Sequence, residues 1–468
     1  MSTFEGLQRA ASGLAAARAG MTVTGQNIAN ERTPGYTRQR LEQAATPAAG
    51  QAARWGADVA VGGGTTVTGV ARLGDDLLDA RVRDALSASG FWGARAAAAG
   101  RAEAAMGEPT ETGLAAGLDR FWAAWSDLAN TPGGAAAEVV LTGARTLVDQ
   151  ISSGYETVAR QWSELRAQVE GDVADVNATA SRLAALNGQI RSALQSGREA
   201  NELIDQRDLL AQQLSTAVGA TATLAADGTL TVRVDGNALV SGDRSRELVA
   251  SGPRDVAEGG AVTVAWADRA DVVVALTGGE IGGALSVLAP AESGGALARV
   301  AAAYDDTARA LASSVNELHR SGQTTAGEPG GDFFALEPGR PAALALRVVP
   351  TGLDDLALAA PGAGALDTTI ADRIGSLGAA ESGPSSTWAT FVTGFGVAVA
   401  GDVQRADVAD IGAVAAVSAQ QANASVDADE ETINLLTYQT AYQAAARVLT
   451  AVDEALDVLI NRTGLVGR

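Results

Sequence analysis

The side chains that could carry out covalent or metal chemistry are few in this 468-residue chain. Cysteine and lysine are absent, and His319 is the only histidine. The sequence therefore excludes a disulfide framework, a thiolate nucleophile, a zinc–thiolate site and a Schiff-base lysine. A Ser-His-Asp arrangement would have to use His319. Because this residue closes a helical pattern, where an imidazolium suits the helix dipole, we expect it to be structural. We expect no catalytic residue, no cofactor and no metal site, and so no enzyme.

Two other patterns could suggest chemistry. The run Thr277–Gly283 has the glycines of a phosphate-binding loop, but a glutamate stands in its middle and no lysine can complete it. We expect a strand-to-helix exit there instead. Acidic residues outnumber basic ones by 55 to 34, so pairs of carboxylates are common by composition alone. A carboxylate-based hydrolase of cell-wall glycans therefore stays open only as a remote alternative.

The aromatic group at Phe121, Trp122 and Trp125 could form a binding box. Its spacing is helical, and at that spacing large aromatics more often anchor the core of a helix bundle. We expect the core.

The bulk composition indicates a helical protein that is not suited to bind negatively charged partners. Hydrophobic residues make up 47% of the chain but aromatics only 4%, because alanine supplies much of the apolar share. The formal net charge of −21 argues against binding to nucleic acid or to an anionic membrane surface. Neither a basic start with an apolar signal segment nor a span of membrane length is visible, so the sequence alone indicates a cytoplasmic protein.

The elements that organise the chain are its two ends. Residues 426–468 read as a helix, with Asp427 as N-cap and Glu430 three residues on. Its apolar residues alternate in steps of three and four, the spacing of a coiled-coil seam. The seam residues are Leu435, Tyr438, Tyr442, Ala445, Leu449, Val452, Leu456 and Leu459.

The N-terminal segment repeats the same spacing and is the expected partner of that helix. Its seam consists of Leu7, Leu14, Met21 and Ile28. Beside it runs one glycine in each heptad, at Gly6, Gly13 and Gly20. Glycine costs a helix about 1 kcal/mol relative to alanine, so this stripe predicts the close approach of another backbone. Chance in a glycine- and alanine-rich chain is the alternative.

Between the ends we expect a mainly α fold in three further parts. Residues 75–218, 281–330 and 388–425 have helical periodicity and predict an elongated helical bundle. Residues 219–280 alternate with period two between turn dipeptides, and residues 344–370 read as short strands and turns. Residues 219–280, together with 336–385, therefore predict an outward β-rich or α/β lobe. Residues 41–74 predict an extended linker. Residues 1–40 and 426–468 form the terminal coiled-coil region.

One short motif follows the N-terminal helix. It consists of Asn27, Asn30, Thr33, Pro34, Gly35 and Tyr36. Pro34 and Gly35 suit the two central positions of a type II turn. The motif, with Thr37-Arg38-Gln39 after it and Asn434–Val448 near the C-terminus, resembles the family of bacterial flagellar rod, hook and hook-associated proteins. Thr37-Arg38-Gln39 and the C-terminal pattern are similar to its hook-associated members.

This resemblance implies a structural subunit of the bacterial flagellum at the junction of hook and filament, assembled as a ring of copies through its terminal helices. It implies the flagellar hook protein and hook-associated protein 3 as neighbours, and an export chaperone on the C-terminal helix. It also replaces the cytoplasmic expectation by an extracellular one, with type III export and no cleaved signal. A hook or distal rod protein of the same family is the nearer alternative.

Overall fold

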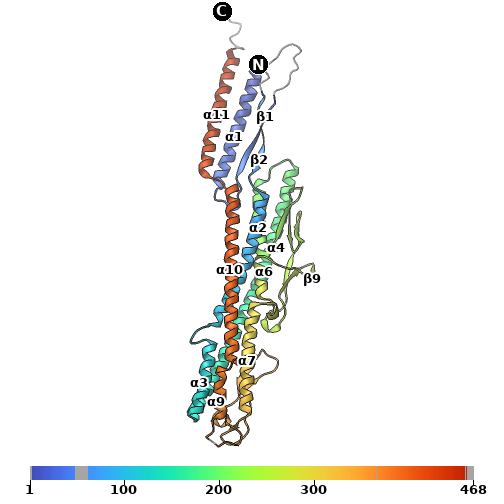
Figure 1. Cartoon of the computed structure of the whole chain (residues 1–468). Coiled ribbons are helices and arrows are strands. Elements are labelled where there is room, and N and C mark those ends of the chain that lie inside the picture. Colours follow the sequence, from blue (N-terminus) through green and yellow to red (C-terminus); the bar gives the residue numbers. More distant parts are fainter. Residues whose placement is uncertain (1–2, 48–61, 365, 459, 461–468) are drawn as a thin grey trace, which may run out of the picture.

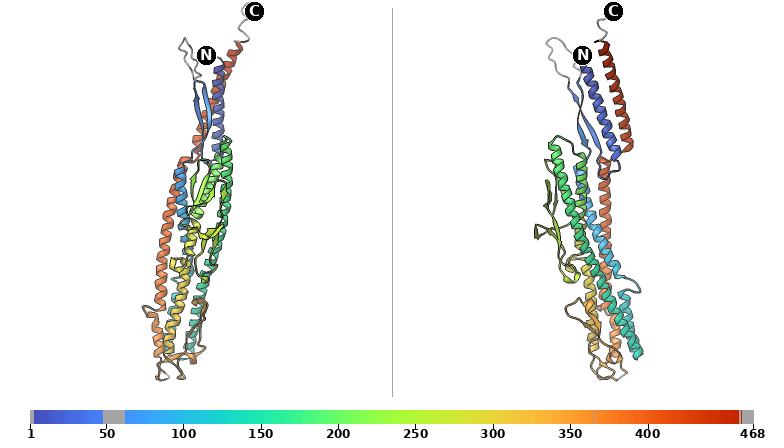
Figure 2. Two further views of the ribbon diagram at one scale, coloured as in Figure 1. Left: turned by 90° about the vertical axis from the view of Figure 1, so that its right-hand side faces the viewer. Right: turned by 180° about the vertical axis from the view of Figure 1, so that it is seen from behind.

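The computed structural model describes residues 3–47, 62–364, 366–458 and 460. The molecule is elongated: long helices follow its length, the described ends of the chain lie together at one end, and most strands lie to one side (Figures 1 and 2). The fold class predicted from the sequence, mainly α with small β additions, is confirmed.

Four long helices form the bundle: α2 (Asp76–Met106), α4 (Gly134–Gln195), α7 (Ala296–Arg320) and α10 (Pro384–Ala424). Local sequence determines their ends. At the start of α2 the carboxylate of Asp75 accepts hydrogen bonds from the backbone N–H groups of Leu77 and Leu78. The helix ends at Gly107, which has φ 63°. With 62 residues, α4 runs for about 90 Å. The long periodic stretch at 135–196 predicts this rod.

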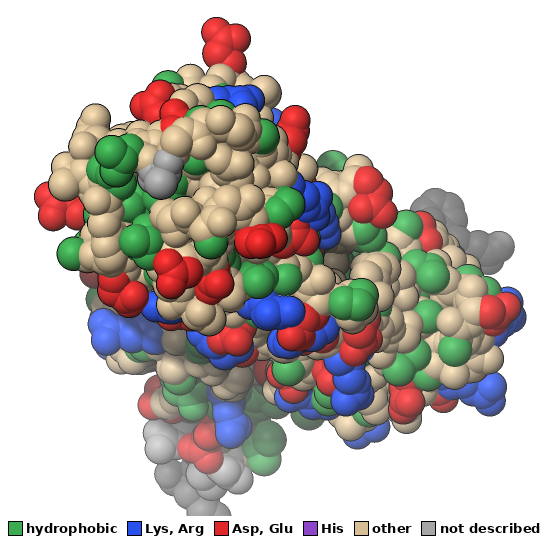
Figure 3. Space-filling model, turned by 90° about the horizontal axis from the view of Figure 1, so that it is seen from below, with side chains coloured by type: hydrophobic (Ala, Val, Ile, Leu, Met, Phe, Trp, Pro, Cys, Tyr) green, Lys and Arg blue, Asp and Glu red, His purple; other side chains and the backbone are tan. Residues whose placement is uncertain are grey.

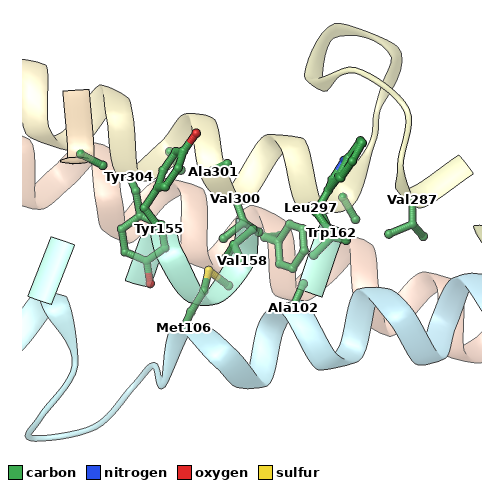
Figure 4. Packing of buried hydrophobic residues seen from close by; sticks show 14 of the residues in the cluster. Ala102, Met106, Tyr155, Val158, Trp162, Val287, Leu297, Val300, Ala301 and Tyr304 are labelled. Carbon is green, nitrogen blue, oxygen red and sulfur yellow. The ribbon is translucent and has the colours of Figure 1, made fainter. Parts of the chain in front are cut away.

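The core of the bundle is continuous along these helices. Small side chains of α2 allow α4 and α7 to approach it, and larger side chains fill the space between them. Figure 4 shows this packing, with α2 contributing two of the labelled residues, α4 three and α7 four. They are Ala102 and Met106; Tyr155, Val158 and Trp162; and Leu297, Val300, Ala301 and Tyr304.

Shorter helices complete the bundle: α3 (Leu114–Asn130), α5 (Asn201–Val218), α6 (Gly279–Val287), α8 (Ala342–Ala345) and α9 (Thr369–Gly375). The glycine run before α6 is a strand-to-helix exit, as expected. A Cβ at Gly279 would lie 2.5 Å from the backbone nitrogen of Gly219, so glycine permits a close approach of two backbones.

The outward lobe consists of two small antiparallel sheets that share no strand. The first has the order β3 (Thr221–Leu224), β4 (Leu230–Val234), β5 (Asn237–Ser241) and β6 (Arg244–Ser245). The second is β7 (Leu248–Ser251), β8 (Thr263–Trp266) and β9 (Arg269–Val273). Both lie beside α4, against which β5, β6 and β7 pack (Figure 1).

The segment 336–385 differs from the expected grouping, because it does not join this lobe. It lies at the end of the bundle remote from the chain ends, where α9 packs on α3 and α7. Two small strand pairs are found there: β10 (Gln323–Thr324) with β13 (Ala357–Ala359), and β11 (Phe334–Leu336) with β12 (Leu346–Val348). Seen from this end, hydrophobic, acidic and basic side chains are interspersed (Figure 3).

The aromatic group of α3 belongs to the core at this remote end, as expected. Phe121 and Trp125 are fully buried, and both contact Phe333. His319 is buried beside them and is satisfied by backbone alone: Ala357 N–H donates to Nε2 at 3.0 Å, and Nδ1 lies 2.8 Å from the Gly331 carbonyl oxygen. Nδ1 therefore carries the proton.

The terminal unit is a separate layer at the opposite end. Its parts are α1 (Thr3–Asn30), α11 (Ala428–Asp457), β1 (Gln39–Thr46) and β2 (Gly64–Arg72). α11 packs on one side of α1, and the antiparallel β1–β2 pair packs on another (Figure 1). The described parts of the segment 41–74, expected as an extended linker, are thus mostly paired strand, and residues 48–61 of that expected linker lie outside the described residues. Leu41 is buried, and this burial is what orders β1 against α1.

Candidate functional site: the terminal helix pair and its joint to the bundle

The two terminal helices run antiparallel with a constant register. A Cβ at Gly6 would meet Val452, one at Gly13 would meet Ala445, and one at Gly20 would meet Tyr438. Each step of seven residues along α1 thus matches a step of seven back along α11. The same register continues one heptad further to Asn27, which binds Glu431. The glycine stripe therefore faces α11.

The glycines differ in how strongly they are needed. At Gly20 the ring of Tyr438 lies only 2.4–2.6 Å from the position a Cβ would take, so no side chain fits without movement. At Gly6 and Gly13 the corresponding distances of 3.7 and 3.9 Å are ordinary contacts. Of the three glycines in the stripe, only Gly20 therefore requires the absence of a side chain.

The seam residues proposed from the sequence lie along this contact but are only partly covered in the single chain. Tyr442 is 36% exposed, and Leu459 lies outside the described residues. The half-buried members are Leu7, Leu14, Met21, Ile28, Leu435, Tyr438, Leu449, Val452 and Leu456.

The motif after α1 forms the predicted turn. Tyr36 N–H donates to the Thr33 carbonyl oxygen at 3.1 Å, and Gly35 has φ 79°, as a type II turn requires. Asn30 holds the start of the turn, because its side-chain oxygen accepts from the Thr33 hydroxyl at 3.1 Å. Thr33, Pro34 and Gly35 are exposed.

Asn27 uses its whole hydrogen-bonding capacity in this turn. Its amide nitrogen donates to the Gln39 carbonyl oxygen at 2.8 Å and to Glu431 at 3.0 Å. Its oxygen accepts from the Gln39 N–H at 3.0 Å and from the Tyr36 hydroxyl at 2.8 Å. A side chain with both donors and an acceptor is needed, which excludes aspartate. Burial first, and the charge of Asp205 second, raise the pKa of the Tyr36 phenol, so it stays a donor.

Arg38 binds both glutamates in the first turn of α11. Its Nε donates to Glu431 at 2.8 Å, and its two terminal nitrogens donate to Glu430 at 3.0 and 2.7 Å. The Glu431 side chain is 3% exposed, whereas that of Glu430 is 56% exposed. The hydrogen bonds to Glu430, followed by the charge of Glu431, raise the pKa of Arg38 against the effect of burial. A buried carboxylate such as Glu431 requires this partner.

A second polar cluster joins the terminal unit to α5 of the bundle. Arg72, at the end of β2, donates to Asp205 at 2.6 Å and lies 3.0 Å from Asp208. Arg207 also binds Asp208, at 2.9 Å. Burial raises the pKa of the Asp205 carboxyl, and the charge of Arg72 opposes that rise. Asp205 also accepts from the Thr37 N–H at 3.1 Å.

Sequence reasoning missed Arg72, Asp205 and Asp208, and it assigned no contact to Glu431, which lies in the acidic first turn of the C-terminal helix. The available signal was weak: an arginine that closes a strand, and acids three residues apart at the start of a helix. Such residues normally form a solvated face. Only the fold brings them together, over separations of 133 and 393 residues.

The arrangement is suited to holding helices together. Among the described residues, no group of acidic and histidine side chains could hold a metal ion, and no helix is apolar for long enough to cross a membrane.

Comparison with known proteins agrees with this plan. Residues 99–334, half of the chain, match the family model described as the flagellar hook-associated protein FlgK helical domain. Residues 422–462 match the model of the flagellar basal body rod FlgEFG protein C-terminal region, which covers α11.

Individual proteins are similar over long stretches. Flagellar hook-associated protein 1 of Bacillus subtilis is 29% identical over the full length of both chains. The protein of that name from Escherichia coli is 29% identical over 72% of this chain and 61% of its own length, and that of Salmonella typhimurium is 28% identical over 70% and 59%. The structure of the hook junction protein FlgK from Burkholderia pseudomallei is 25% identical, with a TM-score of 0.46 over 56% of this chain and 47% of its own. The match to the helical domain covers half of the sequence, and the chain therefore belongs to the flagellar hook-associated protein FlgK family.

Proposed function

We propose that this chain is a structural subunit at the junction of hook and filament in the bacterial flagellum, and that copies of it form a ring. The observation that carries the proposal is the antiparallel terminal helix pair, whose seam residues remain half-buried in the single chain. Burial of these residues against neighbouring copies would supply the free energy of assembly, at about 25 cal/mol per Å² of apolar surface. The helical-domain match favours this role over that of a hook or distal rod protein.

The surface of a second helix supports lateral contact between copies. α10 buries one apolar face, with Trp388 and Phe395, against the bundle. Its opposite face is apolar as well: Val397, Val408 and Ile411 are 71%, 65% and 69% exposed. Helices that are apolar on all sides are normally covered, and a neighbouring copy would cover this face.

The family implies further partners, which we include in the proposal: the flagellar hook protein on one side, hook-associated protein 3 on the other, and an export chaperone that binds α11. Ile433, Leu436 and Val448 of α11 are exposed and would suit a helical groove. Export by the flagellar type III pathway, without cleavage, would bring the chain outside the cell.

A gene deletion tests the proposal. We expect cells that keep their hooks but lack filaments and release flagellin into the medium. Loss of the hook itself would indicate a hook or rod protein, and normal filaments would contradict the proposal. Complementation with Ile411→Asp should fail, while the folded variant keeps its helical content, because Ile411 is exposed in the single chain. Asp410→Asn, at the neighbouring exposed position, should complement.

A peptide tests the chaperone contact separately. Residues 427–461 should bind the chaperone, and Tyr438→Ser with Leu449→Ser should weaken binding by several kcal/mol, since buried aromatic and leucine side chains contribute about 1.5–3 kcal/mol each. Equal affinities of the two peptides by calorimetry would show that the chaperone does not bind the face of α11 that carries Tyr438 and Leu449.

A further inference from the structure

Four consecutive residues lie where the terminal unit meets the bundle. We propose that the segment Tyr36–Gln39 couples the docking of α11 on α1 to the direction in which the terminal unit leaves the bundle. Glu431 is the positioning residue on one side of this segment, and Asp205 is the positioning residue on the other. The coupling belongs to the single chain and goes beyond the proposed assembly, because it does not depend on any neighbouring subunit.

Tyr36, Arg38 and Gln39 bind the terminal helices, and the Gln39 backbone does so through both hydrogen bonds to Asn27. The Tyr36 hydroxyl donates to Asn27 of α1 at 2.8 Å. The Arg38 side chain binds Glu431 of α11 at 2.8 Å, and Asn27 binds the same carboxylate at 3.0 Å. The first turn of α11 is therefore held by α1 and by the segment at once.

The same segment also binds the bundle, through the Thr37 and Arg38 backbone N–H groups and the Gln39 side chain. The Thr37 N–H donates to Asp205 of α5 at 3.1 Å, and the Arg38 N–H donates to the carbonyl oxygen of Ala424, the last residue of α10, at 2.9 Å. Gln39 reaches α5 as well, through its side-chain nitrogen, 3.4 Å from Glu202. Four helices, α1, α5, α10 and α11, thus meet on four residues of chain.

Adjacent residues cannot move independently over such short distances. If Glu431 leaves, Arg38 loses its buried partner, and the backbone that carries the Thr37 and Arg38 N–H groups is freed with it. Elsewhere the terminal unit meets the bundle through the chain crossings at 73–75 and 425–427, which lie outside helices and strands, and through polar contacts to α5. A polar interface between units permits relative motion unless a specific contact prevents it.

Distance measurements between spin labels test the coupling in the full chain, which has no native cysteine to interfere. One pair, Ala15→Cys with Asp84→Cys, reports on the terminal unit relative to α2. A second, Ala15→Cys with Gln443→Cys, reports on the spacing of α1 and α11. All three positions are exposed. In the parent chain we expect a narrow distribution for both pairs, and a broad first distribution would overturn the proposal.

The matched variants are Glu431→Ala and Glu430→Ala, since both glutamates bind the same guanidinium. Glu431→Ala should broaden the first distribution by about twofold or more, because Arg38 and the buried Asn27 amide both lose the carboxylate that joins them to α11. The second distribution should stay narrow. Glu430→Ala, at an exposed position, should change neither. If both distributions broaden equally, Glu431 merely holds the helix pair together, and the coupling is wrong.

Asp205→Asn tests the other side, because it weakens the contacts of Asp205 to the Thr37 N–H and to Arg72, and it does not touch α11. It should also broaden the first distribution and leave the second unchanged. Distant substitutions usually have additive effects, so the double variant Glu431→Ala/Asp205→Asn distinguishes coupling from two independent contacts. We expect it to broaden the distribution little beyond either single variant. Fully additive broadening, or no effect of either substitution, would overturn the proposal.

Discussion

At the residue scale, Gly20 shows what a single missing Cβ does for the terminal helix pair. Gly20→Ala would place a methyl group inside the ring of Tyr438, so α1 and α11 must move apart or the tyrosine must leave its position. We expect a loss of about 1–3 kcal/mol in the free energy of unfolding of the terminal unit, as for other overpacked contacts. Hydrogen exchange of α1 and α11 measures it.

Gly25 is the control for this substitution, because it lies in the same helix with nothing within 4 Å of the Cβ position. Gly25→Ala should stabilise α1 by about 0.5–1 kcal/mol through helix propensity alone. If both variants are stabilised, Tyr438 does not occupy the space above Gly20 in solution.

His319 predicts a pH dependence at the opposite end of the molecule. Burial lowers its pKa, although the Gly331 carbonyl and the charge of Asp332 act in the opposite direction. Protonation would place a second N–H against the Ala357 N–H. Because the folded pKa is depressed, the stabilisation is complete above the unfolded pKa of about 6.5 and is lost as the pH falls below it, toward the folded value.

Thermal unfolding between about pH 7.5 and 5.5 tests this titration, since the chain has no other histidine. We expect Tm to fall with pH in the parent chain. In His319→Gln, whose side-chain oxygen can still accept from Ala357, this part of the pH dependence should vanish. A decline of the same size in the variant would assign the effect to carboxylates.

At the element scale, α11 presents two apolar faces with different tasks. Leu449 lies on the half-buried seam in register with α1, whereas its neighbour Val448 is 52% exposed. Leu449→Asp should separate α11 from α1 at a cost of about 1–3 kcal/mol, because a half-buried polar group loses hydration without a partner. Val448→Asp should leave the pair intact and impair only contacts with other molecules.

Circular dichroism and hydrogen exchange on the two variants separate these outcomes. Loss of protection along α11 in Leu449→Asp alone is the expected result. Loss in Val448→Asp as well would mean that the outer face is also covered within the single chain.

The elements show how far the sequence alone could lead. Heptad spacing predicted the terminal pair because α1 and α11 bury their apolar faces mainly against each other. The spacing within each helix therefore shows which face is covered. Turn chemistry predicted the type II turn at Pro34 and Gly35, because the residues of a turn themselves determine its type. The β1–β2 pair was expected as a linker, because its strands pair with each other and pack on α1, and the local sequence pattern contains neither contact.

The polar contacts between the terminal unit and the bundle could not be predicted, because they depend on the tertiary fold. Arg38 and Glu431, or Arg72 and Asp205, are ordinary surface residues until the fold buries them. An arginine or an acidic residue can pair with many side chains, and the spacing of these residues in the sequence does not identify the partner. Likewise, the short strands and turns predicted within 344–370 suggested that 336–385 belongs to the β lobe, whereas α9, with buried Ile370 and Ile374, packs on α3 and α7.

At the scale of the whole molecule, charge opposes association and apolar surface favours it. Each copy carries a formal net charge of −21, so copies repel one another at low ionic strength. The uncovered surfaces that would join them, on α10 and α11, carry exposed valine, isoleucine and leucine side chains. Their attraction does not depend on counterions, whereas the repulsion does.

The balance predicts that self-association strengthens with salt. The Debye length falls from about 10 Å at 0.1 M to about 3 Å at 1 M, which screens the repulsion and leaves the apolar contacts. Sedimentation velocity over this range should show a growing share of oligomers in the parent chain. Ile411→Asp should stay monomeric throughout, because it removes attraction rather than repulsion. If added salt instead dissociates the oligomers, ion pairs between copies hold them together, and the apolar face of α10 is not the contact.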